Sequence, residues 1–399
     1  MVFRESYDAL VVGARCAGAA TAMLMARRGL RVLAIDRAAY GADTVSTHAL
    51  MRGGVLQLSR WGVLPAVREM GTPAVRSTSF HYADEVLDIA IQPSDGVDAL
   101  YAPRRTLLDS LLVDAAREAG AAIRHAHTLA DLIRRPDGRV CGATIIDAEG
   151  NAIAVGAELV IGADGIGSKV ARLSGAQTVR EARSATAVAF GYISGIGLTG
   201  YHWYFRAGVT AGVIPTNAGQ HCVFVSIPPE RFRSGAWRSA RWAEYRHALA
   251  DIAPDVAAAI PPGASAEPLR IFAGHKGFFR QAHGPGWALV GDAGYFKDPV
   301  TAHGITDAFR DAELLADAAA AGTVSALADY AATRDALSVP LFDVTERIAS
   351  FDWDADEIKA LHRGLNRAMK EEVAYLEARG SADGSVSVQT ASLAREEVS

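Results

Sequence analysis

A glycine-rich turn near the N-terminus, GARCAG at residues 13–18, has the residue types that bind a dinucleotide diphosphate. The usual pattern is G-x-G-x-x-G, in which the following helix presents its positive N-terminus to the phosphates. Arg15 replaces the second glycine. A cation near the N-terminus of a helix is destabilised by the helix dipole by up to about 1 kcal/mol. If the turn required a positive φ at Arg15, that conformation would cost a similar amount. We therefore expect an anion beside Arg15 that offsets these costs. The residues that we assign to this turn are Gly13, Arg15, Cys16, Ala17 and Gly18.

Three carboxylates follow predicted strands and could accept hydrogen bonds from sugar hydroxyl groups. Asp36 comes 23 residues after Gly13, where a dinucleotide-binding unit holds the adenosine ribose, and we assign Asp36 and the adjacent Arg37 to the cofactor site. The alternative is that Asp36 is a surface acid beside Arg37. Asp164 lies in VIGADGIGSK and Asp292 in WALVGDAG, each in a glycine turn. Asp164 could instead brace its turn, and Asp292 could instead cap a helix.

Taken in order, the GARCAG, D-G and G-D motifs resemble the FAD-binding frame of the p-hydroxybenzoate hydroxylase superfamily over residues 7–320. That superfamily contains aromatic-ring monooxygenases, flavin-dependent halogenases and geranylgeranyl reductases. The GARCAG variant, DTVSTHAL and KDPVTAHGITDAFRDAELL are similar to segments of one branch of it. The resemblance implies that FAD is the cofactor, and that the arginine changes the branch and not the class of ligand.

The resemblance also implies roles for single residues around the cofactor. Gly291 and Asp292 would hold a ribityl hydroxyl, and Asp164 would shape the pyrophosphate side and the path of a nicotinamide cofactor. The family commonly carries an arginine that reaches FAD just before the helix TLLDSLLVDAAREAGA. Arg105 has the better spacing for that role, and Arg104 is the alternative.

The loop from Pro299 to Gly304 would cover the flavin ring. The helix that starts after it, with Ile305 in its first turn, would direct its amides at the pyrimidine edge, where negative charge develops on reduction. His303 lies in this loop, and His48 lies where the family chain passes the ring, so each is a candidate for steering a proton or shaping the oxygen site. The alternative for each is a packed, hydrogen-bonded histidine.

The strand YHWYF at residues 201–205 is the best candidate for the substrate side. It resembles the Y-x-W-x-F-P motif of geranylgeranyl reductases, with Arg206 in place of the proline. The following segment, AGVIPTNAG, resembles a hairpin of the monooxygenases. The two-tryptophan element of the halogenases does not occur here. Alternation places the side chains on two faces and does not decide which face looks inward. One face carries Tyr201, Trp203 and Phe205, and the other carries His202, Tyr204 and Arg206.

The elements that position these residues predict a mixed α/β fold. DALVVGA, a helix through Ala26 and LRVLAID form a βαβ unit, and buried strands also precede the D-G and G-D motifs. We predict a Rossmann-like FAD-binding domain with an inserted antiparallel-sheet substrate domain and C-terminal helices. The predicted boundaries are 1–75, 100–180 and 270–339 for the FAD-binding domain, 76–99 and 181–269 for the β-rich domain, 340–380 for the C-terminal helices and 381–399 for a loose tail.

Composition excludes several classes of protein. A net charge of −5, from 40 basic and 45 acidic residues, argues against a nucleic-acid binder. The three cysteines, Cys16, Cys141 and Cys222, show no metal-ligand spacing, so we expect no metal site, no disulfide framework and a cytoplasmic location. The first apolar stretch carries Arg15 in its middle, so we expect no integral membrane segment.

We therefore predict an FAD-dependent monooxygenase that acts on a small aromatic or unsaturated molecule through a flavin C4a-hydroperoxide, with NAD(P)H as electron donor, directly or through a separate flavin reductase. The alternatives are a flavin-dependent reductase of isoprenoid double bonds and a non-catalytic, FAD-stabilised binding protein. The sequence leaves the substrate, the donor and the oligomeric state open.

Overall fold

The computed structural model describes residues 3–83, 85–233 and 235–396. An eight-stranded sheet forms the centre of the FAD-binding part, in the order β16-β17-β8-β1-β2-β5, with β6 and β7 joined to it through β8. The pairs β1·β2, β1·β8, β8·β17 and β2·β5 are parallel. The strands are β1 (Glu5–Val12), β2 (Val32–Asp36), β5 (Ala122–His125), β6 (Thr128–Arg134), β7 (Val140–Ile146), β8 (Ala152–Gly162), β16 (His283–Gly284) and β17 (Trp287–Leu289).

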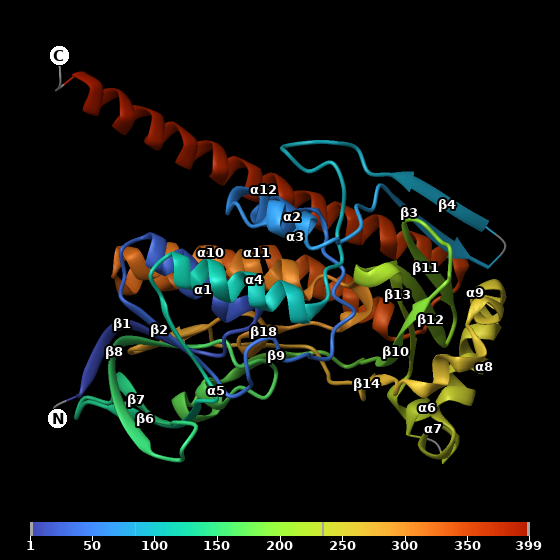
Figure 1. Cartoon of the computed structure of the whole chain (residues 1–399), viewed down its shortest axis with the longest axis horizontal. Coiled ribbons are helices and arrows are strands. Elements are labelled where there is room, and N and C mark those ends of the chain that lie inside the picture. Colours follow the sequence, from blue (N-terminus) through green and yellow to red (C-terminus); the bar gives the residue numbers. More distant parts are fainter. Residues whose placement is uncertain (1–2, 84, 234, 397–399) are drawn as a thin grey trace.

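Both faces of this sheet are covered, which is why its strands are continuous apolar runs. Ala9 and Val11 of β1 belong to the cluster that packs against the helices, whereas Leu10 and Val12 point into a second cluster with β6, β7 and α5 (Lys169–Ser174). The helix α1 packs against α10 and α4 (Figure 1). The helices of this layer are α1 (Cys16–Arg27), α2 (Arg52–Arg60), α3 (Leu64–Glu69), α4 (Arg105–Glu118) and α10 (Gly304–Ala321).

A seven-stranded sheet, in the order β14-β10-β13-β12-β11-β3-β4, forms the second part of the molecule (Figure 1). All neighbours are antiparallel except β11 and β3. Short helices cover its outer face, and its inner face joins the large core of the FAD-binding part. Its elements are β3 (Ser77–Tyr82), β4 (Glu85–Ala90), β10 (Ala187–Ser194), β11 (Tyr201–Arg206), β12 (Val209–Pro215), β13 (Gln220–Ile227), β14 (Arg270–Phe272), η1 (Asn217–Gly219), α6 (Pro229–Phe232), α7 (Gly235–Ser239), α8 (Arg241–Ile252), α9 (Pro254–Ala259) and η2 (Pro262–Ala266).

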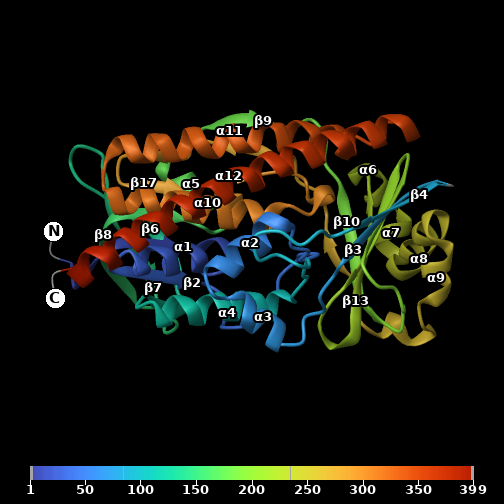
Figure 2. The same cartoon turned by 90° about the horizontal axis from the view of Figure 1, so that it is seen from above.

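A small third sheet joins β9 (Thr178–Glu181), β15 (Phe278–Arg280) and β18 (Tyr295–Phe296). Two long helices, α11 (Val324–Ala349) and α12 (Ala355–Glu396), close the chain, and α12 runs back from the seven-stranded sheet along the molecule over α2 (Figure 2). The predicted fold class, including the C-terminal helices, is confirmed.

Two predicted boundaries differ from the structure. The boundary at 339/340 falls inside α11, because Pro340 is accommodated within that helix. The stretch from 381, predicted as a loose tail from its small polar residues, is helical as far as Glu396; the chain has no proline after Pro340 that would stop the helix. The last predicted tail residues, 397–399, lie outside the described residues. Among the helices of the described ranges, none is both long and apolar enough to cross a membrane.

Candidate functional site

The GARCAG turn joins β1 to α1, and both of its glycines are required by space. Gly13 has φ +102°, and a Cβ atom on it would lie 2.4 Å from the carbonyl oxygen of Ala163. A Cβ atom on Gly18 would lie 1.8 Å from the carbonyl oxygen of Gly13. Arg15 stands at the N-cap of α1 with φ −92°, an extended conformation without strain, so the positive φ considered for this position does not occur.

The Arg15 side chain turns back from the helix axis toward the loop after β2. Its guanidinium lies 3.4 Å from the Asp109 carboxylate and 3.2 Å from the Asp43 carbonyl oxygen, with its side chain 30% exposed. Asp109 also accepts two hydrogen bonds from Arg105, at 2.9 and 3.1 Å, and one from the Cys16 thiol at 3.1 Å. Asp109 was not among the predicted site residues, although its position four residues after Arg105 in a predicted helix was a usable signal.

The three sequence motifs meet at the start of α1. The D-G motif touches the turn through Ala163, beside Gly13, and a Cβ atom on Gly291 of the G-D motif would lie 2.9 Å from the Cβ atom of Ala17. Glycines of the first and third motifs therefore let three segments that are far apart in the chain approach one helix N-terminus. Such a terminus presents unpaired amide groups and a positive dipole to an anion.

The carboxylates near the turn have different surroundings. Asp36, at the end of β2, accepts hydrogen bonds at 2.8 Å from the amides of Ala14 and Ala38, and so joins the turn to the next loop. Asp164 accepts from the Ser168 hydroxyl at 2.5 Å and the Lys169 amide at 2.6 Å, which fits the alternative role of bracing its turn. Within the described part of the chain, the exposed Arg37 has no hydrogen-bond or ion-pair partner.

Asp292, in the 3₁₀ turn η3 (Gly291–Ala293), is half-buried and makes no hydrogen bond to any other described residue. Burial raises its pKa to about 6, while the charges of Lys297 and Arg105 act in the opposite direction. A carboxylate in this position has free acceptor capacity that a hydroxyl-rich ligand can use.

The loop before α10 is held on both sides. Asp298 accepts hydrogen bonds from the amide and hydroxyl of Thr186, at 2.6 and 2.7 Å, and so ties the 3₁₀ turn η4 (Pro299–Thr301) to the residue before β10 of the other sheet. Ala302 takes a left-handed conformation with φ +51°. Gly304 opens α10, and a Cβ atom on it would meet nothing within 4 Å, so this helix start faces open space.

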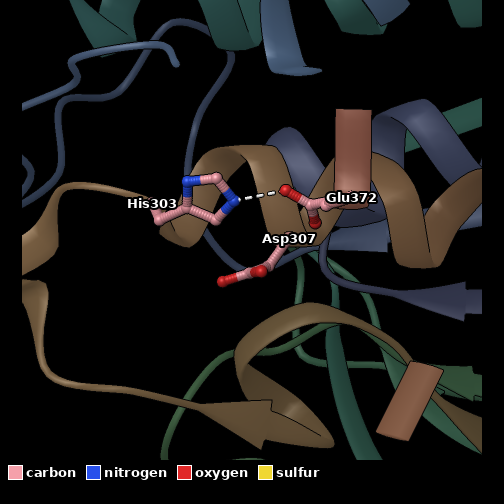
Figure 3. A group of neighbouring side chains, drawn as sticks. All are labelled: His303, Asp307 and Glu372. Atoms are coloured by element: carbon pink, nitrogen blue, oxygen red, sulfur yellow. Dashed lines mark hydrogen bonds and ion pairs between the residues drawn. The ribbon is translucent and has the colours of Figure 1, made fainter. Parts of the chain in front are cut away.

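His303 ends this loop and belongs to a buried ionic network (Figure 3). Its Nε2 atom donates a hydrogen bond to Glu372 of α12 at 2.5 Å. Arg310 donates to the other Glu372 oxygen at 2.6 Å and to Asp307 at 3.1 Å. Lys297 forms an ion pair with Asp307. Burial lowers the pKa of His303, although Glu372 favours its charged form. The contacts fit the alternative of a packed, hydrogen-bonded histidine; Glu372 was not predicted, because it comes from a helix remote in sequence.

Three members of this network carry side-chain groups of the kinds that ligate metal ions. One ligand atom from each of His303, Asp307 and Glu372 lies within 4.8 Å of the others. However, Lys297 and Arg310 already pair with the two carboxylates and neutralise them. The network therefore serves packing without requiring a metal ion.

His48 is the other predicted histidine, and its environment is unusual. It is fully buried, has φ +49°, and neither ring nitrogen makes a hydrogen bond of normal geometry among the described residues. Its ring stacks on Tyr192 of β10 with centroids 5.6 Å apart. Burial, helped by the charges of Arg104 and Arg105, lowers its pKa to about 3, so the ring is neutral. His48 therefore faces the other sheet with unused hydrogen-bonding capacity.

The aromatic strand β11 has one face on each side of its sheet. Tyr201, Trp203 and Phe205 are buried in the large core that continues into the FAD-binding part, on the face that also carries Tyr192. Tyr204 is buried in the cluster beneath α8 and α9 instead. Tyr204 was predicted for the substrate side together with Tyr201, Trp203 and Phe205. The alternation of the strand turns Tyr204 away from the FAD-binding part, and the contact of these residues with a substrate stays a prediction.

These residues fit FAD on three observations. No side chain of the described residues caps the first turn of α1, so its amides remain available for phosphate oxygens. Asp292 has free acceptor capacity beside that turn, and open space lies at Gly304. Pro299, predicted as a catalytic residue of the loop over the flavin ring, and Ile305, predicted to bind the cofactor, lie at the two ends of the loop that leads into this space.

Comparison with known proteins agrees with this geometry. A family described as "FAD binding domain" matches residues 6–340. The digeranylgeranylglycerophospholipid reductase of Methanosarcina acetivorans is 26% identical over 340 residues, covering 79% of this chain and 75% of the relative.

Solved structures share the fold at low sequence identity. The flavin-dependent brominase Bmp2 is 18% identical with a TM-score of 0.76 and covers 93% of each chain. PqsL, described as a probable FAD-dependent monooxygenase from Pseudomonas aeruginosa, is 20% identical with a TM-score of 0.71 and covers 94% of this chain and 100% of its own.

Proposed function

Because the chain belongs to the FAD-binding-domain family and is an FAD-dependent oxidoreductase, we propose that it is a monooxygenase that inserts one atom of dioxygen into a small aromatic or unsaturated molecule. When bound, FAD supplies the electron transfer and oxygen activation that side chains cannot provide. NAD(P)H is the proposed donor of electrons, directly or through a separate reductase.

The residues around the turn bind and orient the cofactor in this proposal. The N-terminus of α1 holds the diphosphate, with Arg15 and Arg105 at its side, and Asp36 lies on the adenosine side. Asp292 accepts a hydrogen bond from a ribityl hydroxyl. The amides at the start of α10 stabilise negative charge on the pyrimidine edge of the ring.

The loop before α10 is the observation that carries the choice of oxygenation. Asp298 and Thr186, both fully or nearly fully buried, join this loop to the seven-stranded sheet and hold it in place beside the open space at Gly304. In this proposal FAD and the substrate fill that space, and the fixed loop limits the entry of water. A dry site slows the loss of activated oxygen as peroxide, which a monooxygenase needs and a double-bond reductase does not.

Reduction of isoprenoid double bonds is the second candidate, because a relative that matches over 79% of the chain is named as a digeranylgeranylglycerophospholipid reductase. The buried aromatic face of Tyr201, Trp203 and Phe205 is compatible with an apolar substrate of that kind.

Oxygen labelling separates the candidates. The FAD-loaded protein is reduced without air and supplied with phenolic, indolic and polyprenyl compounds, with and without isotopically labelled dioxygen, and products are weighed by mass spectrometry. A product that carries the label supports the proposal. A product that is heavier by two hydrogen atoms and forms equally well without oxygen overturns it in favour of reduction, and tight FAD binding without any turnover overturns it in favour of a binding protein.

A further inference from the structure

A second group of charged and aromatic side chains lies between the two parts of the molecule and touches the phosphate turn only through the backbone of Asp43, which accepts a hydrogen bond from Arg15. Tyr192 of β10 is at its centre. The guanidinium carbon of Arg104 lies 3.4 Å from the centroid of the Tyr192 ring, and that of Arg270 of β14 lies 4.7 Å from it. His48 stacks on the same ring. We name these four residues, together with Asp43, the Tyr192 cluster.

The Tyr192 cluster carries an excess of positive charge. Its two arginines share one carboxylate, because Asp43 lies 3.0 Å from Arg270 and 3.6 Å from Arg104. His48 is neutral, so two cations face one anion. The side chains of Arg104, Asp43 and Arg270 are 19%, 28% and 30% exposed, so they remain reachable from solvent. One guanidinium therefore has the capacity to bind a further anion.

Unused polar atoms gather in the same cluster. The Tyr192 hydroxyl and the Arg104 Nε atom are buried and have no hydrogen-bond partner among the described residues. The two ring nitrogens of His48 have none of normal geometry, although the backbone of Ala102 lies close enough to favour the charged ring. Buried polar atoms are nearly always paired in folded proteins, and several unpaired ones on neighbouring side chains point to a missing partner. Hydroxyl and N–H groups beside two guanidinium groups match a group of several oxygen atoms that carries negative charge.

We propose that the Tyr192 cluster binds an oxyanion, a carboxylate or a phosphate group, of the substrate, an inference that rests on the proposed oxidoreductase function. We assign the oxyanion to the substrate because Tyr192 and Arg270 belong to the seven-stranded sheet. Arg104 and Asp43 lie on the side of the FAD-binding part, where Arg15 contacts the Asp43 carbonyl oxygen, so the test below includes FAD as the competing source. In the free protein, Asp43 neutralises part of the charge and competes with the ligand. The enzyme therefore selects substrates with an acidic group.

Titration of the FAD-loaded protein with simple probes tests this. Benzoate and inorganic phosphate represent the two oxyanions, and benzamide is a neutral match for benzoate. We expect calorimetry to show that benzoate or phosphate binds and that benzamide binds at least tenfold more weakly than benzoate. Arg270→Gln should weaken anion binding about ten- to hundredfold, and Tyr192→Phe about two- to tenfold. Arg206→Gln, an exposed arginine on the same sheet, is the matched control and should change nothing.

The Asp43→Asn variant tests the proposal by the direction in which the affinity for the anion changes. If Asp43 competes with the ligand, its neutralisation strengthens anion binding, whereas a merely structural carboxylate would weaken binding when lost. Retained FAD content and an unchanged near-ultraviolet spectrum show that each variant is folded, and Arg270→Lys should keep more affinity than Arg270→Gln.

Three results would overturn the inference. Equal affinities for benzoate and benzamide would show that the cluster does not recognise negative charge. Loss of FAD from the Arg270 variant with unchanged benzoate affinity would assign the cluster to the cofactor, and an effect on NADPH binding alone would assign it to the electron donor. None of these touches the oxygen-labelling test. Conversely, a reductase outcome in that test leaves the benzoate titration interpretable.

Discussion

Replacing Glu372 by glutamine should loosen the C-terminal helix from the loop before α10. The Glu372 carboxylate binds His303 at 2.5 Å and Arg310 at 2.6 Å, and all three side chains are at most 2% exposed. Breaking a buried charge pair by removing one partner costs about 3–5 kcal/mol. Arg310 keeps Asp307 and Asp311, and a glutamine oxygen can still accept one bond, so we expect the lower end, about 3 kcal/mol.

The measurement is the urea midpoint of unfolding at saturating FAD, together with hydrogen exchange of α12. The neighbouring exposed residue supplies the control, because Glu371→Gln makes the same chemical change on the surface and should stay within about 0.5 kcal/mol of the parent. We expect Glu372→Gln alone to lower the midpoint and to speed exchange over residues 355–380. Equal midpoints for the two variants would refute the reasoning.

The pH dependence has a fixed sign. Burial alone would raise the pKa of Glu372, but His303 and Arg310 hold it below its ordinary value of 4.5. The unfolded chain therefore takes up a proton before the folded one as the solution is acidified. The stability from Glu372 is present above pH 4.5 and is lost on acidification through the folded pKa, so the difference between parent and variant should shrink there.

Three further predictions concern the cofactor and the packing of α12. Asp292→Ala should weaken FAD binding about ten- to hundredfold, measured by flavin retained on ultrafiltration, since a charge-assisted hydrogen bond is lost; unchanged retention would contradict its role. Arg15→Gly should fold and bind FAD with an altered salt dependence, whereas Arg15→Glu should bind FAD much more weakly. Equal FAD affinities for the parent and Arg15→Glu at all ionic strengths would show that the Arg15 side chain points away from the phosphates. Burial lowers the pKa of His362 to about 4, so the unfolded chain binds its proton first as the pH falls below 6.5, and stability should drop by about 2 kcal/mol between pH 7 and 5. Urea titrations of the parent and of His362→Leu check this last prediction, which fails if both lose the same stability.

The sequence alone determined the fold class and the class of cofactor. Both depend on local features. A position that needs a positive φ or a close backbone neighbour requires glycine, so the sequence itself reveals such positions, as at Gly13 and Gly18. The order of three such turns after apolar strands was enough for the family. The helix from Gly304 was likewise predicted, since its apolar period and its glycine C-cap at 322 are local.

Only the tertiary structure decided the partners of the charged residues. Glu372 reaches His303 across 69 positions, and Arg270 reaches Asp43 across 227, so no local pattern connects them. Alternation gave two faces of β11 but not which of them packs inward, since that depends on where α8 and α9 lie. Side-chain pairing in the interior follows from how elements pack, and burial then sets charge states such as that of His48, because the surrounding chain removes the water that would solvate the charged form.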